Sequence, residues 1–331
     1  MALLEIEDLT IDFRSLDGTV RALYGVNLSV EPGEVRGLVG ESGCGKSQTC
    51  LAIPRLVHPS GTVRAKSIRF DGDELTSWSE RRMRSLRGNK ISMIFQEPMT
   101  SLNPCLTVGE QLSEPLVLHR NSTWGEARER AVEMLSRVGI SDAAQRYHEY
   151  PHQLSGGMRQ RAMIAMALIC EPRLLLADEP TTALDVTVQA QILELMKRLR
   201  DETGAAILLV THNLGVVAQI CDRVSVMYAG RIAEEGTARE IFAQPDHPYT
   251  RGLMHSVPRL RPPEGTPEKL EPIPGSVPNI SAMPSGCPFH PRCKYAEDIC
   301  ASLLPDFVET GPGHRALCHF AGQLDEKEAR V

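Results

Sequence analysis

The chain has 331 residues and a formal net charge of −6, and 42% of its residues are hydrophobic. This length allows two domains, or one large domain with an appendage, and the composition is that of a globular protein with a substantial core. The mild acidity argues against a dedicated nucleic-acid binder. No apolar stretch approaches 18 residues, and the first eight residues include Glu5, Glu7 and Asp8 where a secretory signal needs a basic region and an apolar core. We therefore expect no transmembrane helix, no secretory signal and a cytosolic chain with reduced thiols.

The first 95 residues predict strands on both sides of a glycine-rich loop. Alternating apolar residues predict strands over 3–13 and 20–30, and a continuous apolar run predicts a third strand over 35–39. A helix should follow the loop and should kink or end at Pro54. Residues 68–95 predict short strands around a tight turn, followed by a helix rich in arginine.

Further along the chain, predicted helices alternate with buried strands. We expect helices over 108–139, 158–169 and 189–199, strands over 174–177 and 206–210, and a hairpin over 224–232. Such alternation is typical of an α/β fold with a parallel sheet, and the helical block 108–170 interrupts it as an insertion. The last 87 residues differ in composition, because they hold 14 of the 23 prolines and four of the nine cysteines.

The loop after the third strand matches the pattern G-x-x-x-x-G-K-[ST] in full, as Gly40-Glu41-Ser42-Gly43-Cys44-Gly45-Lys46-Ser47. Its glycines let backbone N–H groups face phosphate oxygens, and the helix that follows adds the positive end of its dipole. Lys46 is predicted to reach the β- and γ-phosphates and Ser47 to bind Mg²⁺, with Gly40, Ser42, Gly43, Cys44 and Gly45 lining the phosphates. We interpret the Cys44 side chain as a small filler and not as a redox group.

Two acidic residues, Asp178 and Glu179, follow the apolar run Leu174-Leu175-Leu176-Ala177. A carboxylate at the end of a buried strand can hold Mg²⁺ near a P-loop, and the next carboxylate can polarise the attacking water. The pattern is weak alone and strong with a P-loop upstream. We therefore predict Asp178 as a magnesium ligand and Glu179 as the general base.

The segment Leu154-Ser155-Gly156-Gly157-Met158-Arg159-Gln160-Arg161 resembles the signature motif of the ATP-binding cassette (ABC) family. The resemblance implies that Ser155, Gly156 and Gly157 form a second anion-binding nest, which acts on the γ-phosphate of the ATP held by a partner's P-loop. Met158 stands where the family has glutamine, a departure that should matter little. The implied fold is a P-loop NTPase cassette with a RecA-like parallel sheet core, an antiparallel β subdomain and a helical insertion.

Other positions match the family in order. Gln96 resembles the glutamine that senses Mg²⁺ or water and contacts the transmembrane partner, and Ala183-Leu184-Asp185 resembles the D-loop. His212 resembles the switch histidine on the γ-phosphate, and Phe13 resembles the aromatic residue under adenine. The resemblance thus implies an ATP site with catalytic residues Glu179, His212 and Gln96, with Asp185 at the nucleotide, and with Mg²⁺ held by Ser47, Gln96 and Asp178.

Three C-terminal motifs narrow the resemblance to the ATPases of dipeptide and oligopeptide importers. They are Gln244-Pro245-Asp246-His247-Pro248-Tyr249-Thr250, Ile273-Pro274-Gly275-Ser276-Val277-Pro278 and Cys287-Pro288-Phe289-His290-Pro291-Arg292-Cys293. The resemblance implies an ABC nucleotide-binding domain over residues 1–240 with a helical subdomain at about 98–165. A Pro/Cys-rich C-terminal extension then covers residues 241–331.

The four cysteines of this extension are Cys287, Cys293, Cys300 and Cys318, separated by five, six and seventeen residues. They suggest a staple for a small fold; the C-x₂₋₄-C pairs of structural zinc are absent, whereas iron–sulfur ligation tolerates other spacings. The subfamily resemblance implies a [4Fe–4S] cluster here, with zinc or unligated reduced thiols as alternatives. His290, His314 and His319 are alternative ligands if a thiolate is missing.

The resemblance implies an ATP-hydrolysing peripheral subunit, on the cytoplasmic face of the cell membrane, that energises import of dipeptides or oligopeptides. Expected partners are two transmembrane permease subunits, a second ABC ATPase in a heterodimer or homodimer, and an extracytoplasmic solute-binding protein, with no nucleic acid. One alternative is a related importer for nickel, opines or glutathione. Another is a soluble cassette ATPase acting on ribosomes or DNA, which the single P-loop and the acidity disfavour.

Overall fold

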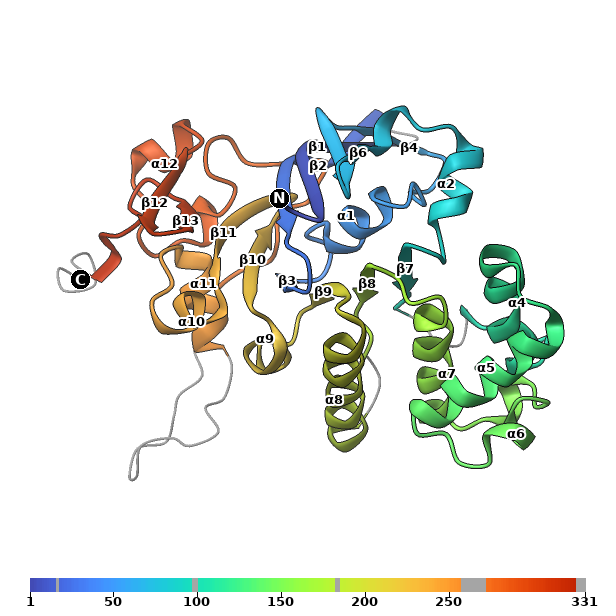
Figure 1. Ribbon diagram of the computed structural model, residues 1–331. Coiled ribbons are helices and arrows are strands. Elements are labelled where there is room, and N and C mark those ends of the chain that lie inside the picture. The colour runs from blue at the N-terminus through green and yellow to red at the C-terminus, as the bar shows by residue number, and fades with distance from the viewer. Residues whose placement is uncertain (16–17, 97–100, 182–184, 257–271, 326–331) are drawn as a thin grey trace, which may run out of the picture. The chain divides into compact units, whose positions relative to one another are not determined.

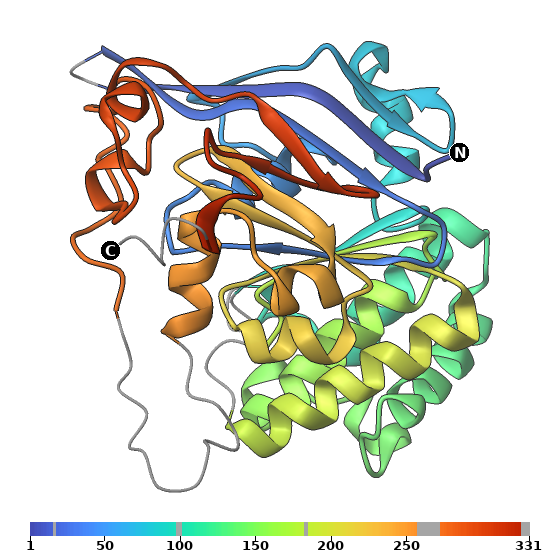
Figure 2. The same cartoon turned by 90° about the vertical axis from the view of Figure 1, so that its left-hand side faces the viewer.

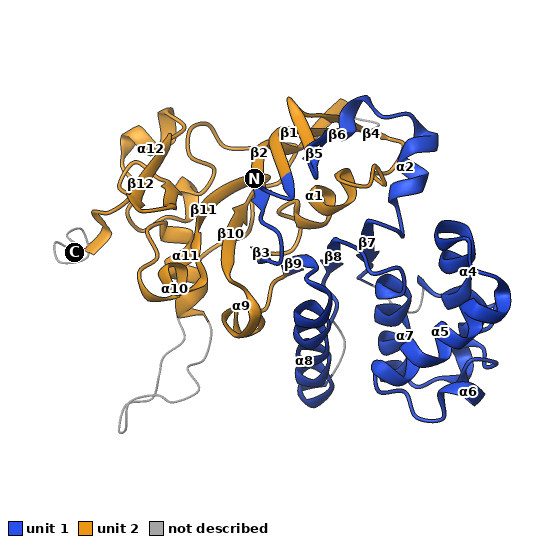
Figure 3. Cartoon of the chain, viewed as in Figure 1, with its two compact units in different colours: residues 1–4, 29–35, 69–210 blue, residues 5–28, 36–68, 211–331 orange. Residues whose placement is uncertain are grey.

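The computed structural model describes residues 1–15, 18–96, 101–181, 185–256 and 272–325 (Figure 1). The chain divides into two compact units (Figure 3). Unit 1 comprises Met1–Leu4, Ser29–Val35 and Arg69–Val210, and unit 2 comprises Glu5–Leu28, Arg36–Ile68 and Thr211–Val331. Among the described residues, no helix has the length and apolar character that crossing a bilayer requires.

Unit 1 contains three parallel strands in the order β7, β8, β9. Central β8 (Leu174–Asp178) pairs with β7 (Ile91–Ile94) and with β9 (Ala206–Thr211), so that Leu175 lies between Ser92 and Ile207. Every residue of β8 and β9 is buried. A continuous apolar run is what a parallel strand covered on both faces requires.

Unit 1 also contains helices and 3₁₀ turns. They are α2 (Glu80–Leu86), α4 (Val108–Arg120), α5 (Trp124–Arg137), α6 (Ala143–Arg146), α7 (Gly156–Leu168) and α8 (Val186–Thr203), with 3₁₀ turns η1 (Leu75–Ser77) and η2 (Pro151–Gln153). Helices α4, α5 and α7 pack against one another (Figure 1). Both α4 and α5 begin with a capping box, Thr107 with Glu110 and Thr123 with Glu126, which fixes where each helix starts.

Unit 2 contains a mixed sheet in the order β12, β13, β11, β10, β3. The strands are β3 (Val35–Val39), β10 (Arg223–Tyr228), β11 (Arg231–Thr237), β12 (Phe307–Gly311) and β13 (His314–Leu317). Strands β3 and β10 are parallel, and the other pairs are antiparallel. The hairpin of β12 and β13 lies beside β11, with Ala316 opposite Glu234 (Figure 2). The C-terminal residues therefore add two strands to the sheet beside β11.

The remaining elements of unit 2 are antiparallel strands and short helices. Strand β1 (Leu4–Ser15) lies between β2 (Gly18–Val30) and β4 (Gly61–Arg64). The helices are α1 (Lys46–Ala52), α9 (Leu214–Ile220), α10 (Ala238–Ala243), α11 (Pro248–His255) and α12 (Asp298–Ser302), with the 3₁₀ turn η3 (His290–Arg292). Where the chain passes from unit 2 to unit 1, β5 (Ser67–Phe70) and β6 (Asp73–Glu74) form a hairpin around Asp71 and Gly72, both at positive φ.

The predicted elements agree in type with the observed ones, and the differences lie at their ends. Helix α1 ends at Ala52, so the predicted effect of Pro54 is confirmed. The single helix expected over 108–139 is two helices, because the chain turns at Asn121, whose φ of 53° is left-handed. The predicted α/β alternation is confirmed, with mixed rather than purely parallel sheets.

Candidate nucleotide site

The glycine-rich loop of unit 2 leaves the fully buried strand β3 and enters α1. A Cβ atom on Gly40 would collide with the carbonyl oxygen of Met227 and would lie 2.9 Å from the Cys44 sulfur. Gly43 and Gly45 have φ values of 80° and 106°, which other residues rarely adopt. Glycine is thus required at Gly40 by a close backbone approach and favoured at the other two by conformation.

Lys46 turns its ammonium group back into this loop. The side chain is buried, and Nζ donates to the carbonyl oxygens of Gly40 at 2.8 Å and Glu41 at 3.0 Å. Burial raises the pKa of the Cys44 thiol although Lys46 opposes the shift, so Cys44 stays protonated and fills space as predicted. The loop therefore holds one fixed cation, in a form suited to bind phosphate oxygens.

Two residues beyond the motif, Tyr249 and Arg292, also contact the loop, and neither was predicted to lie at the site. The Glu41 N–H donates to the Tyr249 hydroxyl at 2.8 Å. The Glu41 carboxylate accepts from Arg292 Nη1 at 2.7 Å and Nη2 at 3.1 Å. Both belong to motifs that served only to mark the subfamily, and nothing in their spacing indicates a P-loop contact.

In unit 1, two loops that follow neighbouring parallel strands bring a glutamine and a carboxylate together. Gln96 follows β7, and its Nε2 donates to Glu179 Oε2 at 3.1 Å. Asp178 ends β8 and is buried, and Glu179 is 9% exposed. The Glu179 backbone is left-handed, with φ 47°, and its N–H donates to Val210 O at 2.9 Å. Carboxyl ends of adjacent parallel strands are a common place for ligand-binding groups.

Two helix N-termini in unit 1 carry the signature and D-loop residues. Ser155 caps α7 by accepting from the Met158 N–H at 3.3 Å, and Gly156 is exposed. Asp185 caps α8 by accepting from the Val188 N–H at 2.9 Å. The nest expected from Ser155, Gly156 and Gly157 therefore starts a 13-residue helix, where free N–H groups favour anions. Residues 183 and 184 of the D-loop lie outside the described residues.

The other two residues expected at the nucleotide lie in unit 2. His212 follows Thr211 at the end of β9 and is exposed. Phe13 is half-buried in β1, opposite Gly61 of β4. A Cβ on residue 61 would lie 2.8 Å from the Phe13 ring, so the glycine leaves space for it.

The four C-terminal cysteines lie in one small region. The Cys287 N–H donates to Cys300 O at 2.8 Å, and the Phe320 N–H donates to Cys318 Sγ at 3.4 Å. Burial raises the pKa of Cys318 to about 12, and the neighbouring thiols of Cys287, Cys293 and Cys300 add to the effect. The Cys318 thiol therefore lies close enough to the other three thiols to interact with them.

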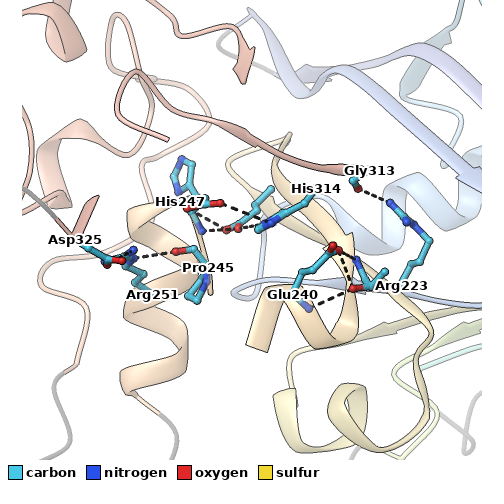
Figure 4. A network of polar contacts seen from close by, with 11 residues as sticks. Arg223, Glu240, Pro245, His247, Arg251, Gly313, His314 and Asp325 are labelled. Carbon is cyan, nitrogen blue, oxygen red and sulfur yellow. Dashed lines mark hydrogen bonds and ion pairs between the residues drawn. The ribbon is translucent and has the colours of Figure 1, made fainter. Parts of the chain in front are cut away.

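The expectation that His314 could replace a missing thiolate is wrong. Its Nε2 lies 2.8 Å from Glu234 Oε1, and its Nδ1 lies 3.6 Å from Asp246 Oδ2. Figure 4 shows His314 in a network of polar contacts that also includes His247 and Glu240. The hydrogen bond to Glu234 raises the His314 pKa despite burial, and Asp246 adds to the rise. His290 and His319 also have one ring nitrogen each in a backbone contact, with Cys287 O and Leu303 O.

Glu234 is the centre of this buried polar network. It is fully buried, and besides His314 it accepts from the backbone N–H groups of Asp246 at 2.6 Å and His247 at 3.0 Å. Burial lowers the pKa of His247 to about 4, so that imidazole is neutral and accepts from the Tyr249 N–H through Nδ1. The network thus fixes the segment that carries Tyr249 to the sheet.

A P-loop after a buried strand, with a carboxylate pair at the end of another strand, defines the class of protein as a P-loop nucleotide hydrolase. The ABC transporter family model matches residues 23–182. The model of the oligopeptide/dipeptide transporter C-terminal region matches residues 233–300.

Curated relatives match almost the whole chain. The oligopeptide transport ATP-binding protein OppD of Escherichia coli is 51% identical, covering 96% of this chain and 93% of its own length. The dipeptide transport ATP-binding protein DppD of Bacillus subtilis is 49% identical, covering 98% and 96%. The chain therefore belongs to the family of ABC transporter ATPases that are the ATP-binding subunits of oligopeptide and dipeptide importers.

Solved structures agree with the fold of the cassette. The ATP-binding cassette MJ0796, in a dimeric post-hydrolysis state bound to ADP and Pi, is 30% identical with a TM-score of 0.64. It covers 71% of this chain and 99% of its own. The CbiO1 protein of Clostridium perfringens, part of an ABC transporter complex, is 31% identical with a TM-score of 0.61 and covers 73% of this chain and 91% of its own. The chain thus has the ABC cassette form of the P-loop α/β fold.

Proposed function

We propose that this subunit hydrolyses ATP with Glu179 as general base and so drives import of dipeptides or oligopeptides. The contact between Gln96 and Glu179 carries the assignment, because it orients a carboxylate next to the buried Asp178. Glu179 accepts a proton from the attacking water, and the Gln96 amide holds the acceptor oxygen in place. The similarity to OppD, an oligopeptide transport ATP-binding protein, and to DppD, a dipeptide transport ATP-binding protein, supports peptide as the transported solute.

The phosphate-binding role falls to the P-loop. Lys46 Nζ exchanges its two carbonyl partners for phosphate oxygens, and the loop N–H groups from Gly40 to Gly45 add further donors. The hydroxyl of Ser47, the Gln96 amide oxygen and the carboxylate of Asp178 are hard oxygen donors of the kind Mg²⁺ prefers. When bound, Mg²⁺ offsets the negative charge of the phosphates.

The remaining site residues act around the γ-phosphate and the base. We assign His212 to the γ-phosphate and Phe13 to the adenine ring. Ser155, Gly156 and Gly157 act on the nucleotide of a second ATPase subunit, with Asp185 beside them. The exposed start of α7 supports this role, because its N–H groups are open to a ligand from another chain.

This assignment implies an assembly. Residues 1–240 form the cassette, with a helical subdomain at about 98–165 that contacts two permease subunits, and residues 241–331 form the Pro/Cys-rich extension. A second ATPase completes the pair, a solute-binding protein delivers the peptide, and the subunit lies on the cytoplasmic face of the membrane. Co-purification with two integral membrane subunits, and uptake of a labelled dipeptide by the reconstituted complex, test this; uptake of nickel or glutathione alone would overturn peptide as the solute.

The donor set of the four cysteines fits a cluster better than one zinc ion. Thiolates at about 2.3 Å from one zinc lie roughly 3.8 Å apart. Among the described residues, the one group of three or more ligand atoms within 4.8 Å of one another is Glu234, Asp246 and His314, so the thiols are spaced more widely. A [4Fe–4S] cluster held by Cys287, Cys293, Cys300 and Cys318 would cross-link this region. Iron and acid-labile sulfide in anaerobically purified protein test it; one zinc and no iron would contradict it.

Substitution of the base separates hydrolysis from binding. Glu179→Gln should lower steady-state hydrolysis at least 10²-fold while ATP still binds, since only proton transfer is lost. Glu194→Gln, on the exposed face of α8, is the matched control and should hydrolyse like wild type. Wild-type turnover in Glu179→Gln would remove Glu179 from the role of base.

A further inference from the structure

Glu41, the second residue of the P-loop, has all three of its polar groups bound. Its N–H donates to the Tyr249 hydroxyl at 2.8 Å, and its carbonyl oxygen accepts from Lys46 Nζ at 3.0 Å. Its carboxylate accepts two hydrogen bonds from Arg292, at 2.7 and 3.1 Å. Two of these partners come from C-terminal residues, 208 and 251 positions away. The conformation of the loop is therefore held from outside as well as by its glycines.

Arg292 is fixed before it reaches Glu41. Its side chain is 5% exposed, its Nε donates to Pro274 O at 2.8 Å, and its guanidinium lies 5.9 Å from the centre of the Phe289 ring. A buried guanidinium with its Nε bound has its two remaining nitrogens aimed in one direction, which suits a two-pronged bond to a carboxylate. The ion pair of Glu41 and Arg292 is therefore fixed in position and carries no net charge.

Tyr249 is held by the same surroundings. Its ring is fully buried and lies 4.6 Å from the ring centre of Tyr228 and 5.5 Å from that of Phe289. Burial raises the pKa of Tyr249, so its hydroxyl stays neutral and can accept the Glu41 N–H. The aromatic group thus fixes the Glu41 backbone, while Arg292 fixes the Glu41 side chain.

A carboxylate inside a phosphate-binding loop opposes phosphate binding unless its charge is balanced, since phosphate and carboxylate repel each other. Glu41 is 30% exposed at its side chain, so it is partly shielded from solvent screening. The ion pair of Glu41 and Arg292 carries no net charge, and Arg292 holds the carboxylate on the side of the C-terminal residues. Without Arg292 it would be a free anion in the loop.

We propose that Arg292 and Tyr249 are positioning residues for ATP, which act through Glu41 by cancelling its charge and fixing its backbone. The proposal rests on the proposed function, in which the P-loop holds the phosphates. It makes the C-terminal residues a part of the nucleotide site, although they carry none of the P-loop, carboxylate or signature motifs.

Binding of Mg²⁺-ADP to the full chain, measured by calorimetry, tests the proposal. Arg292→Ala should raise Kd about tenfold, because a free carboxylate then faces the phosphates. The double variant Glu41→Gln with Arg292→Ala should return to within about threefold of wild type, since the repelling charge is gone. In ATP hydrolysis the single variant should raise KM by a similar factor and leave kcat within about twofold.

The matched control is Arg315→Gln, which removes another C-terminal ion pair, to Glu235 at 2.8 Å, that does not involve Glu41. Its Kd should equal that of wild type. An unchanged Kd in Arg292→Ala would overturn the proposal, as would a double variant as weak as the single one, which would show general loosening of the C-terminal region. If Arg292→Ala does not fold, Tyr249→Phe decides: about threefold weaker binding is expected, and unchanged binding overturns the proposal.

Lys46→Ala separates this proposal from the proposed function. If Lys46→Ala binds Mg²⁺-ADP as wild type does, the phosphates are not at the P-loop and both proposals fail. If Lys46→Ala loses binding and Arg292→Ala does not weaken it, only the positioning role of Arg292 is wrong.

Discussion

The two glycine loops of this chain, Gly40–Ser47 before α1 and Ser155–Gly157 before α7, are built in different ways. The first is held by residues that are distant in sequence. The Met227 carbonyl lies close to Gly40, and Tyr249 and Arg292 form hydrogen bonds with Glu41. The second is held locally, by the cap of Ser155 on its own helix. A Cβ on Gly156 would meet nothing within 4 Å. This difference agrees with the proposed function, in which the first loop binds the chain's own nucleotide and gains from preorganisation, and the second loop is open to the nucleotide of a partner.

The largest loss of stability and of nucleotide binding should come from adding a side chain to the tightly held loop Gly40–Ser47. Gly40→Ala places a methyl group against the Met227 carbonyl, so the loop or β10 must move, at a cost of about 3 kcal/mol of unfolding free energy. Mg²⁺-ADP binding should be lost, and chemical denaturation with calorimetry measures both effects.

The control for this variant lies in the same loop. Gly43 has a positive φ of 80°, but a Cβ there meets nothing within 4 Å. Gly43→Ala should therefore cost only the backbone strain, about 1 kcal/mol. Equal losses in the two variants would show that conformation, and not the contact with Met227, decides the first loop.

A smaller loss of stability should come from weakening the contacts that hold the segment that carries Tyr249. His314 binds Glu234, which also holds the backbone of Asp246 and His247. The carboxylates that face His314, those of Glu234, Asp246 and Glu240, raise its pKa. Its contribution to stability is therefore complete below pH 6.5, the unfolded value, and is lost as the pH rises through the higher folded value.

His314→Gln should lower the unfolding free energy by about 2 kcal/mol at pH 6, the worth of a hydrogen bond to a charged group, and by much less at pH 9. Denaturant titrations at both pH values measure this. His152→Gln, on an exposed histidine, should show no such difference. The pH dependence due to His247 has the opposite sign. Because its pKa is about 4, the stability of every variant that keeps His247 falls as the pH drops from 6.5 toward 4. If the loss of unfolding free energy in His314→Gln grew as the pH rose, the stabilising role assigned to protonated His314 would be wrong.

Local sequence patterns predict the loop Gly40–Ser47 well, but they do not predict the long-range contacts that hold it. The spacing of Gly40, Gly45 and Lys46 and the apolar run of β8 are short-range signals, and both were found from sequence. The bonds of Glu41 to Arg292 and of Glu234 to His314 join residues 251 and 80 positions apart. No periodicity or motif spacing encodes such pairs, because strand order and chain tracing bring them together. The contact between Gln96 and Glu179 was not predicted, because the family resemblance implied only that each residue has a role at the ATP site.

The smallest effect on stability, and the sharpest test of the contrast, should come from filling the open loop. Gly156→Ala adds a methyl group at the first residue of α7, where the space is empty and alanine favours the helix, so the melting temperature should not fall. Mg²⁺-ADP binding by the isolated subunit should be unchanged, since the P-loop is untouched. Hydrolysis by the assembled transporter should fall at least about tenfold, because the methyl group would occupy the nest that we propose binds a partner's γ-phosphate. If instead nucleotide binding by the isolated subunit fell as much as hydrolysis, the second loop would serve the chain's own nucleotide, and the two loops would differ only in how they are supported.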